Sequence, residues 1–88
     1  MHIEPLVRMA NDIGAYFATA DTQEEREQGV LSHIKRYWDP RMRARIIEHY
    51  HSGAAGLSGH VLAAIALLAK EVKEVKIDPR VRGGDGSG

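Results

Sequence analysis

The stretch Arg36-Tyr37-Trp38-Asp39-Pro40-Arg41-Met42-Arg43 decides how this 88-residue chain folds. A residue that precedes proline is driven out of the α region, so a helix that arrives at Trp38 ends before Pro40. Asp39 then stands at an N-cap position and Pro40 at the first helical position, which together start a new helix. The stretch therefore predicts a reversal between two helices, at a corner rich in aromatic and basic side chains.

Two helices are predicted before this reversal. The segment Thr22-Gln23-Glu24-Glu25 has the form of a capping box and starts the helix that leads into the corner. The inward side chains of that helix, taken at helical spacing, are Val30, Leu31, Ile34 and either Tyr37 or Trp38. An earlier helix has Pro5 in its first turn and a stripe formed by Leu6, Met9, Ala10, Ile13 and Phe17. Gly14 lies inside this helix, where it either admits a close neighbour or is merely tolerated.

Two more helices are predicted after the reversal. The third runs from Pro40 to about His51, and Gly53 is placed to end it in a left-handed conformation. Its inward side chains are Met42, Ile46, Ile47 and Tyr50. Ser58 is the predicted N-cap of the fourth helix, which Asp78-Pro79 stops. Because its apolar stripe is wide, we expect this helix to be the most buried.

The predicted fold class is therefore all-α, a small compact array of about four short helices. Residues 3–77 would form a single helical domain, and residues 78–88 a flexible tail rich in Pro and Gly. No apolar run reaches the roughly 18–20 residues that a membrane span requires, so we expect no membrane association. The chain has no Cys, which fits a reducing compartment, and we expect a cytoplasmic location.

Charge is unevenly distributed along the sequence although the formal net charge is zero. Residues 1–29 carry two basic and six acidic side chains, whereas residues 30–52 carry five basic and two acidic ones. A domain that binds nucleic acid through its phosphates is usually positively charged as a whole. The distribution favours a specific protein partner over nucleic acid.

The sequence predicts no catalytic, cofactor-binding or metal-binding residues. His49 and His51 are two positions apart on a helix and so point in different directions, and neither has a ligand four residues away. No Ser/His/Asp or Cys/His arrangement can be built, and no glycine-rich loop follows a strand.

The aromatic and basic corner has two interpretations. Trp38, Tyr37 and Arg41 are residue types enriched in the centres of protein interfaces. Alternatively, Trp38 is the core plug between the second and third helices. The arginines in the first turns of the third helix favour partner contacts, because the helix dipole disfavours positive charge at that end.

Three blocks of this sequence, in order, resemble the delta subunit of NAD-dependent formate dehydrogenase. The first is Leu6-Val7-Arg8-Met9-Ala10-Asn11-Asp12-Ile13-Gly14 with Tyr16-Phe17, and the second is Trp38-Asp39-Pro40-Arg41-Met42-Arg43, preceded by His33 and Tyr37. The third comprises Ile47, His49, Gly53, Gly56-Leu57 and the apolar positions Val61, Ala64, Ile65 and Leu68. The resemblance covers roughly residues 6–69, and Gly59 stands where members often have Pro.

The resemblance implies a non-catalytic accessory subunit of a cytoplasmic complex that oxidises formate to carbon dioxide and reduces NAD. A large alpha subunit would hold a molybdenum or tungsten bis-pterin guanine dinucleotide and iron–sulfur clusters. The beta and gamma subunits would carry FMN and further clusters toward NAD, and this chain would bind no cofactor. It would dock on the alpha subunit to support assembly or stability, through Trp38, Arg41 and Arg43 with support from Tyr37 and Ile47.

The alternative is a small helical module that binds nucleic acid or another anion. It would use the arginines Arg36, Arg41, Arg43 and Arg45.

Overall fold

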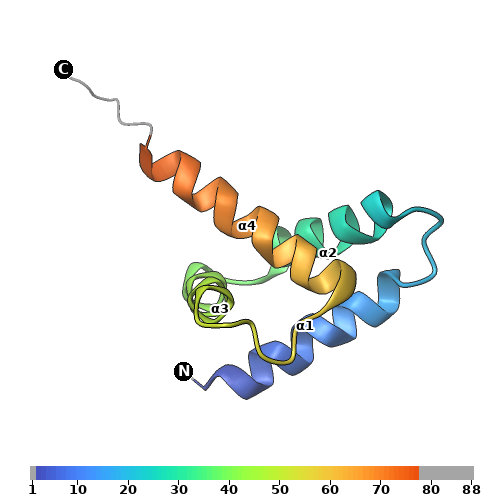
Figure 1. The fold of residues 1–88 in the computed structure, drawn as a ribbon, viewed down its shortest axis with the longest axis horizontal. Coiled ribbons are helices and arrows are strands. Elements are labelled where there is room, and N and C mark those ends of the chain that lie inside the picture. Colours follow the sequence, from blue (N-terminus) through green and yellow to red (C-terminus); the bar gives the residue numbers. More distant parts are fainter. Residues whose placement is uncertain (1, 78–88) are drawn as a thin grey trace.

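Residues 2–77 are described in a computed structural model, with side chains as far as Val72. Within this part the chain forms four helices and no strand, so the all-α prediction is confirmed. The helices are α1 (Ile3–Phe17), α2 (Gln23–Tyr37), α3 (Pro40–His51) and α4 (Gly59–Ile77) (Figure 1). The predicted flexible tail, residues 78–88, lies outside the described residues.

The predicted helix starts are seen at α2 and α3. The hydroxyl of Thr22 accepts a hydrogen bond from the backbone N–H of Glu25 at 3.1 Å, and a Glu25 carboxylate oxygen accepts from the Thr22 N–H at 3.3 Å. At α3 the Asp39 carboxylate accepts from the backbone N–H of Met42 at 2.9 Å, with Pro40 at the start of the helix. Each cap pairs a backbone donor that the helix itself leaves unpaired.

The α3–α4 connection reverses the chain through left-handed backbone. The N–H of Ala54 donates to the carbonyl of His49 and the N–H of Gly53 donates to that of Tyr50, the two bonds of a Schellman motif. Gly53 has φ of 118°, as predicted for the residue that ends α3. The left-handed turn also includes Ala54, with φ of 59°, although a side chain disfavours that conformation.

Helix α4 crosses the other three helices and contacts each of them (Figure 1). It contributes five of the thirteen buried hydrophobic residues, so the prediction that it is the most buried helix is confirmed. The core comprises Leu6, Ala10, Val30, Leu31, Ile34, Trp38, Ile46, Leu57, Val61, Ala64, Ile65, Leu68 and Ala69.

Helices α1 and α4 approach each other closely at Gly14. A Cβ atom on Gly14 would lie 2.2 Å from Cγ2 of Val61, much closer than van der Waals contact. The carbonyl of Gly14 also lies 2.7 Å from Nε2 of His60, at the start of α4. Of the two readings of this glycine, the structure shows the close neighbour.

Candidate functional site

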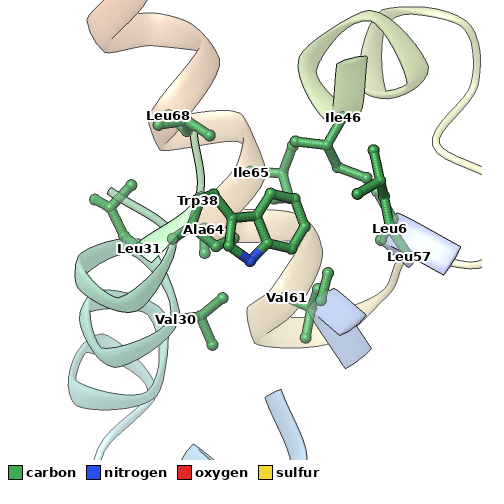
Figure 2. Packing of buried hydrophobic residues seen from close by; sticks show 12 residues of the cluster. Leu6, Val30, Leu31, Trp38, Ile46, Leu57, Val61, Ala64, Ile65 and Leu68 are labelled. Carbon is green, nitrogen blue, oxygen red and sulfur yellow. The ribbon is translucent and has the colours of Figure 1, made fainter. Parts of the chain in front are cut away.

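Trp38 lies in the middle of the core rather than on the surface. Its side chain is 5% exposed, and it is surrounded by Val30 and Leu31 of α2, by Ala64 and Ile65 of α4, and by residues of α1 and α3 (Figure 2). Its backbone N–H closes the last turn of α2 by donating to Ile34. The structure therefore shows the core plug of the two interpretations, and the ring does not face a partner directly.

Tyr37, the neighbour of Trp38 in sequence, points the other way and is 65% exposed. Its ring lies 4.7 Å from that of His33, one turn earlier on α2. The guanidinium carbon of Arg36 is 5.8 Å from the ring centroid, within the range of a cation–π contact. Tyr37 is thus an accessible aromatic side chain beside a positive charge.

Arg43, which is half-buried, links the start of α3 to the end of α2. Its Nη1 donates to the backbone carbonyl of Trp38 and, at 3.4 Å, to that of Lys35. These carbonyls belong to the last turn of α2 and to its C-cap residue, where the helix dipole favours a positive charge and the helix leaves backbone acceptors unpaired. Arg43 therefore has a structural task that the sequence analysis had not assigned to it.

The outer face of α3 carries Arg41 and Arg45. Arg41 is exposed, and within the described residues the structure shows no ion pair for it. Arg45 pairs with Glu48 on the next turn at 3.2 Å. These three residues and Ala44 line a shallow hollow of about 410 Å³.

The five residues predicted to bind a partner therefore do not form one surface. Tyr37 and Arg41 are exposed on either side of the reversal, Arg43 is half-buried, and Trp38 is buried. Ile47 is half-buried and packs against the core. Partner binding by these side chains stays a prediction. Of the five, only Tyr37 and Arg41 are exposed.

Two exposed side chains that the sequence analysis did not propose for binding belong to α1. Tyr16 is 77% exposed and lines a hollow of about 380 Å³ with His33 and Tyr37 of α2. Met9 is 40% exposed and lies two turns before Tyr16 on the same side of the helix. The sequence contained a signal for their exposure, because Met9 lies at the edge of the apolar stripe of α1 and Tyr16 falls outside it.

A second groove lies on another side of α1, against the α3–α4 loop. It has a volume of about 530 Å³ and its lining mixes charged and apolar side chains. The amide of Asn11 links α1 to the loop across this groove by donating to the carbonyl of Gly56 at 3.0 Å. The lining residues are Ile3, Glu4, Val7, Arg8, Asn11, Asp12, His49, Ala55 and Gly56.

In the part of the chain that the structure describes, no three His, Cys, Asp or Glu side chains are grouped so that they could hold a metal ion. His49, one of the two histidines weighed above, instead places Nε2 2.7 Å from the carbonyl of Ala55. None of the helices within residues 2–77 is long and apolar enough to cross a membrane.

Comparison with known proteins bears on this arrangement. A family model described as NADH-dependant formate dehydrogenase delta subunit FdsD matches residues 5–65. That range includes most of α1, all of α2 and α3 and the first part of α4, and thus both the reversal and the exposed side chains beside it. No curated protein and no solved structure shows a significant match to the chain. Because the family model covers well over half of its length, the chain belongs to the family of formate dehydrogenase delta subunits.

Proposed function

We propose that this chain is a non-catalytic accessory subunit that docks on the alpha subunit of an NAD-dependent formate dehydrogenase and supports its assembly or stability. The match of residues 5–65 to the delta-subunit family carries this proposal. The molybdenum or tungsten cofactor, the iron–sulfur clusters, FMN and NAD would all be bound by the partner subunits, in which formate is oxidised to carbon dioxide.

The arrangement at the reversal supports a docking role. Tyr37 and Arg41 are exposed on the two sides of Asp39, whose carboxylate caps α3, while Arg43 and Trp38 hold the two helices together. Side chains held on a rigid support lose little freedom when they bind, which favours affinity. Tyr and Arg are also the residue types that contribute most at interface centres.

The test is reconstitution with the remaining subunits of the enzyme, purified without this chain. We expect the wild-type chain to co-elute with the alpha subunit and to raise the temperature at which that subunit unfolds. Arg41→Ala should weaken the association by about tenfold, the loss of an interface hot spot. Arg8→Ala is the matched control, because Arg8 is also exposed but lines the groove against the α3–α4 loop, and it should bind as the wild type does. Failure of the folded wild-type chain to associate with the alpha subunit would overturn the proposal.

The same titration separates docking from phosphate binding. A chain that binds nucleic acid loses affinity steeply as salt rises, since bound counterions are released. The four arginines of that alternative are not equally available, because Arg43 bonds to backbone carbonyls and Arg45 pairs with Glu48. We therefore expect the association with the alpha subunit to fall only mildly between 50 and 200 mM salt, by less than about tenfold.

A further inference from the structure

The exposed large hydrophobic side chains of this protein are concentrated along the pair formed by α1 and α2. Among the residues that the structure describes there are four such side chains, namely Met9, Tyr16, Tyr37 and Val72. Three of the four belong to α1 and α2, whereas Val72 is on the far part of α4. Together with His33, they form what we call the α1–α2 seam: Met9, Tyr16, His33 and Tyr37.

The seam follows from how the two helices are joined. The connection from Phe17 to Gln23 is short, so α1 and α2 run antiparallel and pack against each other. Tyr16, His33 and Tyr37 line one hollow, which shows that side chains from both helices meet there. Met9 extends the same side of α1 by two turns. The hollow between the two helices and the exposed Met9 side chain on the same side of α1 as Tyr16 together form the apolar strip.

The tyrosine of α1 keeps a ring contact within the molecule although it is exposed. The Tyr16 ring packs edge-on against Phe17 with centroids 4.9 Å apart. Phe17 in turn presses against Gly29 of α2, where an added Cβ would lie 2.4 Å from Cδ1 of the phenylalanine. An exposed aromatic ring on a rigid support contributes little to folding, but it needs little ordering when it binds.

The charges around the seam indicate what could cover it. Arg36 lies against the Tyr37 ring, at the edge of the strip. Its neighbour Lys35 is already paired with Glu71 of α4 at 2.8 Å, so Arg36 is the cation presented beside the seam. On α1, Asp12 lies one turn from both Met9 and Tyr16, so the acidic border of the strip is on α1 and its basic border, at Arg36, is on α2. An apolar strip with a cation at its edge complements an amphipathic segment with an acidic side chain at its border.

We propose that the α1–α2 seam receives an amphipathic helix of the alpha subunit, with its apolar side on Met9, Tyr16 and Tyr37 and an Asp or Glu beside Arg36. Two antiparallel helices leave a groove between them that a third helix fills through its side chains. Helix α4 already packs against both α1 and α2 within the molecule. The seam is the part of the same pair that the described residues leave exposed. This proposal rests on the proposed docking function and adds the seam to the docking surface at Tyr37 and Arg41.

The experiment measures the dissociation constant of full-length variants for the purified alpha subunit. We expect Tyr16→Ala to weaken binding by about tenfold and Met9→Ala by a few-fold, in line with an interface centre and its border. Val72→Ala is the matched apolar control, because it removes a large hydrophobic side chain of similar exposure to Met9 and should leave the constant unchanged. Each of these side chains is exposed, so circular dichroism should show the wild-type helix content.

The charge contribution is tested by reversal at two exposed arginines. Arg36→Glu should weaken binding by about tenfold or more and flatten its salt dependence, whereas Arg8→Glu should change neither. If the wild type binds the alpha subunit and the Met9, Tyr16 and Arg36 variants bind equally well, the seam is not the docking surface while the proposed function stands. If the wild type itself does not bind, both proposals fail.

Discussion

The junction between α2 and α3 and the α1–α2 seam are adjacent regions with opposite designs. At the junction, Trp38 is buried, Asp39 caps α3, and Arg43 bonds to the last carbonyls of α2. At the seam, Tyr37 and Tyr16 are both more than half exposed, and their packing partners are other exposed or half-buried rings. Tyr37 and Trp38 follow each other in sequence, yet Trp38 packs at the junction and Tyr37 is exposed at the seam.

This difference shows that neighbouring residues of one short motif can be buried in the core and exposed for binding. Because α2 ends at Tyr37 and the backbone becomes extended at Trp38, consecutive side chains are directed to opposite sides of the helix pair. The inward side chain stabilises the fold that holds the outward one in position. Mutations at the junction should therefore change folding, and mutations at the seam should change binding.

The largest effect is expected at Trp38, the aromatic side chain buried at the junction. Trp38→Ala removes the largest core side chain and leaves a cavity, so we expect the free energy of unfolding to fall by about 3–5 kcal/mol. Tyr37→Ala should change it by less than about 0.5 kcal/mol, as for an exposed side chain. Urea denaturation followed by circular dichroism measures both, and equal losses for the two variants would show that the regions are not separate.

Helix α1 offers the same contrast between its two sides. Gly14→Ala places a Cβ 2.2 Å from Val61, so the helices must move apart. The better helix propensity of alanine recovers about 1 kcal/mol of a packing cost of about 1–3 kcal/mol, which leaves a net loss of roughly 1 kcal/mol. Tyr16→Ala on the outward side should cost less than that. In a double-mutant cycle, Val61→Ala should relieve the Gly14→Ala clash, and additive losses would show that the contact does not constrain the helices.

Arg43 and Arg41, both at the start of α3, differ in the same way. Arg43→Ala removes charge-assisted bonds to the last carbonyls of α2 and should lower the free energy of unfolding by about 1.5 kcal/mol. Arg41→Ala should change it by less than about 0.5 kcal/mol, while weakening association with the alpha subunit. The two variants have the same change in net charge, so a difference between them reports position alone. Loss of stability in Arg41→Ala equal to that in Arg43→Ala would contradict the assignment.

A smaller effect is expected at the cap of α3. Asp39→Ala leaves the N–H of Met42 without its carboxylate partner, which should cost about 1 kcal/mol. Asp39→Asn is the control, because asparagine also caps helices well and should restore most of the loss. Thermal unfolding of the wild type and the two variants measures these losses, and equal losses in Asp39→Ala and Asp39→Asn would contradict a role of this side chain as a cap.

Local signals in the sequence account for the boundaries of the helices. The Thr22–Glu25 capping box, the Asp39–Pro40 start and the Gly53 end are set by residues within a few positions of each other, so the sequence alone was sufficient to predict them. The spacing of apolar residues likewise predicted that α4 is the most buried helix.

The candidate site was only partly predictable, because exposure depends on packing between distant segments. Helical spacing left the inward position to either Tyr37 or Trp38, and the choice depends on how α4 crosses the end of α2. The bonds from Arg43 to the α2 carbonyls require the reversal angle between two helices, which no local pattern specifies. The place of Tyr16 beside His33 depends on the register of α1 against α2.

The central claim is that Tyr37 serves docking while its neighbour Trp38 serves folding. The most direct measurement is a titration of the purified alpha subunit with the Tyr37→Ala chain, with the free energy of unfolding measured on the same preparation. We predict a dissociation constant about tenfold larger than that of the wild type, with unfolding changed by less than about 0.5 kcal/mol. An unchanged dissociation constant, or a loss of stability large enough to explain the weaker binding, would contradict the account.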